Sequence, residues 1–178
     1  MDKQDRRRLE EAEGFLELDL PQRALVSLEA ASARAKTSFE WRDLAAKAYL
    51  GAGKYTDAVP QLFAALDLNP NAVPLLLALA TCFKKTQQYA RAIEAMRNAE
   101  RLCRRGSNAD SHASISFGLA ACFALARRKG DMLHWLERAF AEDGRLRRNL
   151  LSDCDFDEYR RDPDFVALLQ PGARSQER

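Results

Sequence analysis

Residues 48–70 read AYLGAGKYTDAVPQLFAALDLNP and contain the end of one amphipathic helix, a turn and a second helix. Upstream of the turn, apolar residues recur at intervals of three and four: Trp41, Leu44, Ala45, Ala48 and Tyr49. This stripe stops at the glycine-containing residues 51–54, and a second stripe begins at Ala58 and ends before Pro70. The pattern predicts two helices of about twelve to fifteen residues joined by a tight turn.

The same pattern recurs along the chain with a step of 34 residues. Six columns keep this step: Ala12, Ala46, Ala80; Phe15, Tyr49, Phe83; Ala24, Ala58, Ala92; Leu25, Val59, Ile93; Leu28, Leu62, Met96; and Ala31, Ala65, Ala99. A fourth copy follows after a step of 40, with Ala120, Phe123, Met132, Leu133, Leu136 and Ala139. The six extra residues fall near residues 105–110, where a longer loop or an extra helical turn costs little. The repeats predict an all-α protein in which Ala46, Ala80 and Ala120 are buried between helices.

The second copy, together with LALATCFKKTQQYARAIEAMRNAERL at residues 77–102, resembles the tetratricopeptide repeat family. The resemblance implies a right-handed solenoid of four helix-turn-helix repeats, at about residues 5–38, 39–72, 73–106 and 113–143, which together form residues 1–143. The first and fourth copies depart from the family pattern, as terminal repeats often do.

Residues 150–170, LLSDCDFDEYRRDPDFVALLQ, are similar to the closing segment of many bacterial tetratricopeptide proteins. Asp162 and Pro163 are typical of a helix start, and the helix would carry Phe165, Leu168 and Leu169. We therefore expect residues 144–170 to form a capping helical tail, followed by a frayed terminus at 171–178.

The resemblance also implies that the first helix of each pair lines a concave groove. The candidate partner-binding residues, placed by register, are Leu9, Glu13, Leu16, Asp43, Lys47, Leu50, Leu77, Thr81, Lys84, Phe117, Ala121 and Leu125. Apolar residues interleaved with charges suit an extended or helical peptide. The alternatives are that the strip is covered by the chain's own tail or by self-association into a homodimer. The carboxylate clamp by which some family members bind chaperone tails is missing, because its positions hold Leu9, Glu13, Leu44, Pro74 and Leu77.

The overall charge argues against nucleic acid or a membrane as partner. The chain has 28 Lys and Arg against 26 Asp and Glu, a formal net charge of +2. The basic clusters at residues 104–105, 127–129 and 145–148 lie at predicted helix ends, where cations are favourable, although they could also dock an acidic partner. No apolar window is long enough to span a bilayer, and the charged amino terminus lacks a signal-peptide pattern. The expected location is the cytoplasm.

No constellation of residues typical of catalysis or metal binding is present. The four cysteines form no C-x-x-C pair and have no histidine at ligand spacing, so we expect no zinc site, no disulfide, and buried or half-buried thiols. The acidic run from Asp153 to Glu158 lacks the glycine of a calcium loop and is interpreted as a solvated turn with helix caps. We expect no cofactor and no enzymatic activity.

The sequence thus favours a non-catalytic adaptor or scaffold that binds a peptide or protein segment in its groove. Two alternatives remain. One is a secretion chaperone-like protein, since small tetratricopeptide chaperones are of similar length. The other is a structural subunit whose groove is permanently filled by one assembly partner.

Overall fold

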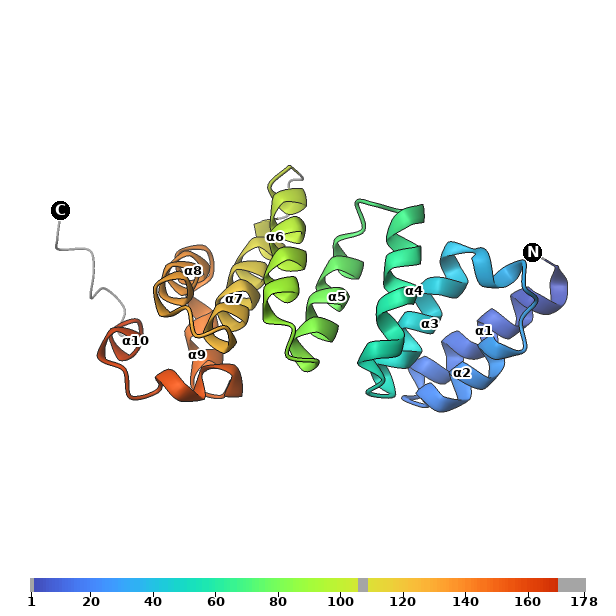
Figure 1. The fold of residues 1–178 in the computed structure, drawn as a ribbon, viewed down its shortest axis with the longest axis horizontal. Helices are drawn as coiled ribbons and strands as arrows, with labels where there is room; N and C mark the ends of the chain where they lie inside the picture. Colours follow the sequence, from blue (N-terminus) through green and yellow to red (C-terminus); the bar gives the residue numbers. More distant parts are fainter. Residues whose placement is uncertain (1, 106–108, 170–178) are drawn as a thin grey trace. The chain divides into compact units, whose positions relative to one another are not determined.

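A computed structural model describes residues 2–105 and 109–169, and this part of the chain is helical and contains no strand (Figure 1). The chain divides into two compact units, Met1–Gln88 and Tyr89–Arg178, and the boundary falls between the two helices of the third copy. The predicted frayed terminus at 171–178 lies outside the described residues. The all-α prediction is confirmed.

The first unit contains five α-helices and a short 3₁₀ helix, in the order predicted for two and a half helix pairs. They are α1 (Lys3–Glu17), α2 (Pro21–Glu29), η1 (Ala35–Thr37), α3 (Phe39–Gly51), α4 (Tyr55–Leu68) and α5 (Val73–Lys85). Within this unit the α-helices α1 to α5 pack in sequence, each on the next, and α1 also packs on α3.

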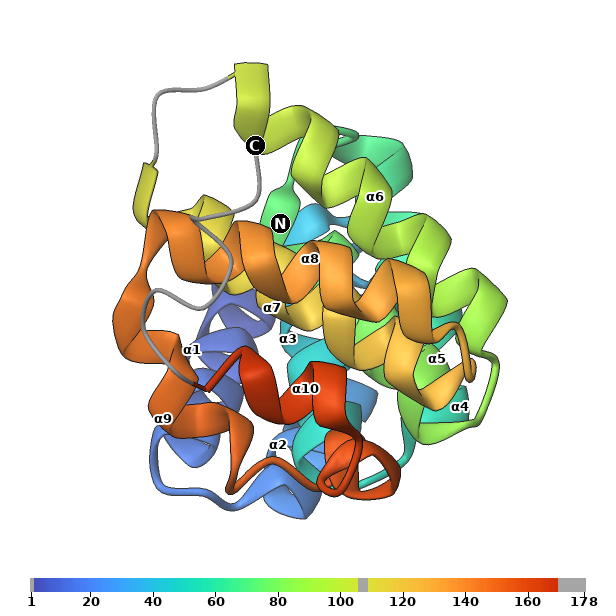
Figure 2. The ribbon, with the colours of Figure 1, turned by 90° about the vertical axis from the view of Figure 1, so that its left-hand side faces the viewer.

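The second unit contains three long helices followed by short helical segments. They are α6 (Tyr89–Arg105), α7 (Ala109–Leu125), α8 (Lys129–Glu142), η2 (Gly144–Leu146), α9 (Arg147–Leu150), η3 (Cys154–Tyr159) and α10 (Pro163–Ala167). The helix α7 packs against α6 on one side and against α8 and η3 on the others. We call η2 to α10 the tail; Figure 2 shows it wrapped beside α7 and α8.

Local residues explain where several helices begin. The hydroxyl of Ser38 caps α3 by accepting from the Trp41 amide, and Pro21 and Pro74 lie in first turns, where their missing N–H groups are harmless. Pro60 lies inside α4 and on its exposed side, so the helix accommodates it without burying an unsatisfied group.

Every helix pair turns through the same left-handed residue. A positive φ occurs at Asp19, Gly53, Gln87 and Arg127, which follow the steps of 34, 34 and 40 residues (φ 55°, 70°, 58° and 57°). In each turn the next residue donates its amide to a carbonyl five residues upstream: Leu20 to Phe15, Lys54 to Tyr49, Gln88 to Phe83 and Arg128 to Phe123. This is the Schellman arrangement, which satisfies the open carbonyls at a helix end. The repeat is therefore present in the backbone as well as in the side chains.

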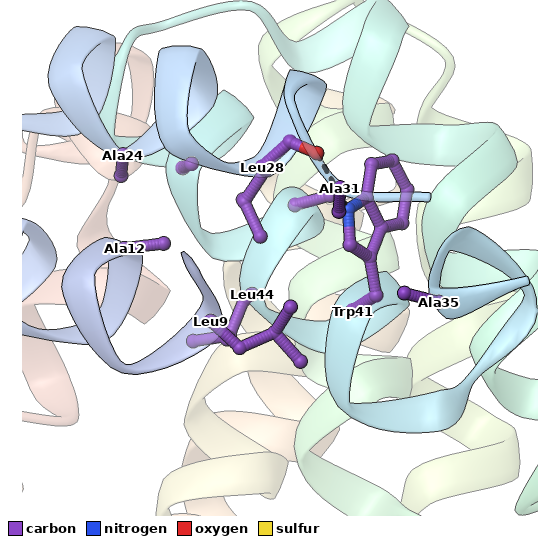
Figure 3. Close-up of a cluster of buried hydrophobic side chains, with 10 residues drawn as sticks. Leu9, Ala12, Ala24, Leu28, Ala31, Ala35, Trp41 and Leu44 are labelled. Carbon is purple, nitrogen blue, oxygen red and sulfur yellow. Dashed lines mark hydrogen bonds between the residues drawn. The ribbon is translucent and has the colours of Figure 1, made fainter. Parts of the chain in front are cut away.

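The repeated small residues are buried, as predicted. Ala46, Ala80 and Ala120 are at most 1% exposed, so the helices approach closely there. In the first unit the core cluster joins α1, α2 and α3 (Figure 3), and the Trp41 indole donates to the Leu28 carbonyl at 3.0 Å across it. The large ring is thus buried without an orphaned N–H group.

A carboxylate fastens the start of α1 to the segment after α2. Asp5 is buried, and its two oxygens accept from the backbone amide of Ser32 at 2.9 Å and from the Ser32 hydroxyl at 2.6 Å. The hydrogen bond from the Ser32 side chain is the main reason why the pKa of Asp5 lies below its ordinary value. This polar contact is fully satisfied, which permits its burial.

The six extra residues of the fourth copy lengthen two helices. Counted from the equivalent residues Ala65 and Ala99, α6 continues three residues further than α4. Counted from the equivalent residues Ala80 and Ala120, α7 begins four residues earlier than α5. Of the two expectations for this region, the extra helical turn is confirmed, although residues 106–108 lie outside the described part.

The tail begins its last helix as predicted. The Asp162 side chain accepts from the amides of Asp164 and Phe165, and Pro163 is the first residue of α10. Phe156 and Phe165 are both 0% exposed, with ring centroids 5.8 Å apart. The tail therefore contributes two large rings to the hydrophobic core of the second unit.

Candidate functional site

A hollow of about 260 Å³ lies between α1 and α3, the first helices of the first two copies. Its lining from α1 is Arg6, Leu9, Glu10 and Glu13, and its lining from α3 is Phe39, Glu40, Asp43, Leu44 and Lys47. Four of the predicted partner-binding residues are thus brought together here: Leu9, Glu13, Asp43 and Lys47. We call this site the α1–α3 hollow.

The base of the α1–α3 hollow is apolar and its walls are charged. Leu9 and Leu44 line the hollow, are 5% and 8% exposed and belong to the core cluster (Figure 3). Phe39 is half-buried, whereas Glu13 and Lys47 are exposed. The site can therefore offer a shallow apolar contact to a ligand whose polar groups meet the walls.

Charges on the walls are only partly paired. The Lys47 ammonium lies 2.7 Å from the Asp43 carboxylate, one helical turn away. Within residues 2–105 and 109–169, Glu10, Glu13 and Glu40 form no ion pair, and neither does Arg6. Three carboxylates against one guanidinium leave the α1–α3 hollow with a net charge of −2.

The candidates on α5 lie on the less buried face of that helix. Leu77 and Lys84 are half-buried and Thr81 is exposed, whereas the flanking Leu79 and Phe83 are buried in the core. The Thr81 hydroxyl donates to the Leu77 carbonyl at 3.0 Å. The half-buried Leu16 and Leu50 occupy the corresponding faces of α1 and α3.

The last three candidates lie on α7, a helix that packs against η3 of the tail. The ring of Phe117 meets that of Phe156 edge-on, with centroids 5.5 Å apart, and Ala121 is 3% exposed. Leu125 is half-buried and borders a second hollow of about 340 Å³ between α7 and η3. The position of Phe117 matches the first alternative for the groove, contact with the chain's own tail.

The second hollow is lined by polar groups that are already engaged. Its charged residues include Arg127 and Glu158, which pair at 2.7 Å, and Asp157, which pairs with Arg160 at 2.6 Å. The Tyr159 hydroxyl reaches the Ala124 carbonyl at 3.4 Å, and burial raises the pKa of this tyrosine. The acidic run is thus a turn with caps and ion pairs, because Asp153 also caps η3.

The burial of the cysteines follows the prediction except at one position. Each of the four, all within the described residues, carries a thiol; Cys82, Cys103 and Cys122 are buried. The expectation of burial is wrong for Cys154, which is exposed because it starts η3, whose inward position is taken by Phe156. Donor atoms of Asp153, Cys154 and Asp155 lie within 4.8 Å of one another, but the Asp153 carboxylate already accepts from the Asp155 amide.

The basic clusters pair largely with acidic residues of their own unit. Lys129 lies 2.5 Å from Asp162 and 2.9 Å from Asp164, and these bonds raise the pKa of the lysine and lower that of Asp162. Arg128 pairs with Asp131 at 2.7 Å, and Arg104 pairs with Glu100. These pairs agree with the structural interpretation of the clusters and weaken their interpretation as a docking patch.

Sequence reasoning missed five lining residues of the α1–α3 hollow as partner contacts: Arg6, Glu10, Phe39, Glu40 and Leu44. Helical periodicity could have found them. Arg6 and Glu10 lie seven and three residues before Glu13, and Glu40 lies three before Asp43, so each shares a face with a predicted residue. The family register named only three positions of each helix and omitted their neighbours.

Sequence comparison supports the repeat. The tetratricopeptide repeat family model matches residues 49–102, from the end of α3 into α6. Residues 49–102 are tetratricopeptide repeat sequence. No curated protein matches the chain.

Solved structures with a similar fold extend the likeness to the whole chain. "MamA 41-end from Desulfovibrio magneticus RS-1" is 17% identical with a TM-score of 0.73, over 100% of this chain and 99% of that one. "MamA RS-1 ArsTM double mutant" is 16% identical with a TM-score of 0.72, over 95% and 94%. "Crystal structure of MamA protein" is 14% identical with a TM-score of 0.70, over 81% and 75%. The chain therefore has a tetratricopeptide-type helical repeat fold.

No helix among the described residues is long and apolar enough to cross a membrane.

Proposed function

We propose that this protein is a non-catalytic interaction scaffold that binds a segment of another protein in the α1–α3 hollow. The observation that carries the proposal is an apolar base flanked by charged walls between two first helices. Tetratricopeptide repeat sequence at residues 49–102 supports a role in protein binding. The proposed contact residues are Leu9, Glu13, Asp43 and Lys47, with Leu16, Leu50, Leu77, Thr81 and Lys84 as further positions on the first-helix faces.

The α7 candidates have a different place in this proposal. Phe117 contacts Phe156 of the tail and Ala121 is buried, so we propose no partner contact for them. A reducing compartment such as the cytoplasm suits the thiols at all four cysteines.

The experiment is affinity capture from the source cell with the wild-type protein and with a Glu13→Lys, Lys47→Glu variant. Both side chains are exposed, so the variant keeps the fold, and its net charge equals that of the wild type. The matched control exchanges Glu29 and Lys36, which are not part of the α1–α3 hollow. We expect to capture a partner that binds the wild type and the control but does not bind the Glu13→Lys, Lys47→Glu variant. Equal capture by all three proteins contradicts the site.

The same capture separates the scaffold from its two alternatives. An adaptor or a secretion chaperone exchanges its clients, so added competitor should displace the captured protein. A structural subunit holds one partner permanently, and its apparent stability then depends strongly on that partner. A thermal melt of the isolated protein that is cooperative and independent of concentration favours the scaffold.

A further inference from the structure

Two carboxylates of the α1–α3 hollow, those of Glu10 and Glu13, lie three residues apart on α1, at positions where they repel each other. Glu13 lies in the second half of α1, towards the negative end of the helix dipole, and the last turn of α1 contains no basic residue. Neither forms an ion pair within the described parts of the chain. Glu13 therefore carries a cost in stability that no ion pair of the described chain offsets, and Glu10 shares the repulsion although Arg6 lies one helical turn before it.

Glu40 adds to the same field from the opposite wall. It lies in the first turn of α3, where the helix dipole favours it, and it is exposed. The only unpaired cation of the lining among described residues is Arg6, because Lys47 is paired with Asp43. A negative field over an apolar base attracts a cationic ligand that also has an apolar side chain.

We infer that the partner segment of the α1–α3 hollow is basic and carries Lys or Arg next to an apolar anchor. This inference rests on the proposed function and names the chemistry of its ligand. The anchor contacts Phe39, Leu9 and Leu44, and the cation meets the carboxylates of Glu10, Glu13 and Glu40. Arginine fits especially well, because its planar guanidinium can bridge two carboxylates.

The test uses two displayed libraries of otherwise random peptides, one enriched in Lys and Arg and one enriched in Asp and Glu. Both are selected on the full chain, and the best peptides are synthesised for titration. We expect binders from the basic library, with affinity that falls as salt increases. A double Glu10→Gln, Glu13→Gln variant should bind them about tenfold more weakly at low salt and should melt at a higher temperature, since the repulsion is gone.

Two control variants test whether the selected peptides bind in the α1–α3 hollow. Glu17→Gln removes an exposed carboxylate of α1 that does not line the hollow, so it should bind like the wild type. Phe39→Ala removes the half-buried ring from the lining without changing charge, so it should weaken every peptide bound there.

The outcomes separate this inference from the proposed function. Binders from the acidic library that are lost in Phe39→Ala overturn the basic partner and leave the scaffold intact. Basic binders unaffected by the Glu10→Gln, Glu13→Gln variant also overturn it. If no peptide from either library is sensitive to Phe39→Ala, the α1–α3 hollow is not a binding site and both proposals fail.

Discussion

The ring of Phe156 in the tail lies edge-on to the ring of Phe117 on α7, with 5.5 Å between centroids and 65° between ring planes. This pair holds η3 against the face of α7 that carries the groove candidates. Glu13, Lys47 and Thr81 occupy one column of the repeat and are exposed, whereas Ala121, the fourth member, is buried. On α7 this face is contacted by the tail at Phe117 and buried at Ala121, whereas α1, α3 and α5 leave the equivalents of Ala121 exposed.

Phe156→Ala should destabilise the second unit by about 3–5 kcal/mol, because a fully buried ring is lost from a packed core. The matched control is Val166→Ala in α10, whose side chain is 39% exposed and which should cost less than about 1 kcal/mol. Chemical denaturation followed by circular dichroism measures both changes. A similar small effect of the two substitutions would contradict the role of Phe156 as a core residue.

Periodicity predicted the helices because burial repeats with the helix pairs. Ala12, Ala46, Ala80 and Ala120 are buried at the same point of successive first helices, and no long-range information is needed to find them. Asp162 and Pro163 are equally local, since a cap and a first-turn proline describe one helix start. Such features depend only on residues a few positions apart.

The covering of α7 could not be predicted in the same way. The contact between Phe117 and Phe156 joins residues 39 positions apart, and nothing in the spacing of either segment specifies it. The one signal was Ala121, an apolar residue in a column otherwise held by Glu13, Lys47 and Thr81. The α1–α3 hollow was partly predicted, because register identifies a face of a helix but not the width of the gap beside it.

Asp5→Asn should destabilise the first unit at neutral pH, because the ionised carboxylate is the better acceptor for the two Ser32 donors. The folded-state pKa of Asp5 lies below the ordinary 3.8, so its contribution is present above that pH and is lost as the pH falls through the folded pKa. The stability difference between wild type and variant should therefore be largest near neutral pH and shrink in acid.

Urea denaturation at a series of pH values measures this difference. Asp67→Asn, at an exposed position of α4, is the control and should change stability by less than about 0.5 kcal/mol. If the difference in unfolding free energy between Asp5→Asn and wild type stays unchanged at the lowest pH, the charge of Asp5 is not involved.

Gln87→Gly should stabilise the protein by about 1 kcal/mol. Gln87 has a φ of 58°, which costs an L-residue with a Cβ atom roughly 1–2 kcal/mol and costs glycine almost nothing, although glycine also loses more chain entropy on folding. The second copy already has Gly53 at this point, and Gly53→Ala should destabilise to a similar extent. Lys85→Gly, two residues earlier and still helical, should instead destabilise by about 1 kcal/mol. Thermal melts of the three variants must show these opposite signs if the turns are the ones described.

Thiol reactivity should divide the four cysteines into one fast and three slow groups. Cys154 is exposed at the start of η3, whereas burial raises the pKa of the Cys82 thiol to about 11 and also raises that of Cys103. At pH 7 only roughly one in ten thousand Cys82 side chains is then a thiolate, the form that attacks an aromatic disulfide reagent. Labelling of the native protein, with sites assigned by mass spectrometry, should modify Cys154 first.

The control for this experiment is Cys154→Ser, in which the fast phase should disappear while the three slow groups still react after unfolding in denaturant. Because the slow groups become accessible only when their helices open, their rates should follow the stability of the helices that hold them: α5 for Cys82, α6 for Cys103 and α7 for Cys122. Destabilising the tail with Phe156→Ala should then accelerate Cys122, which belongs to the same unit, more than Cys82. Equal acceleration at both cysteines would mean that the two units unfold as one cooperative body.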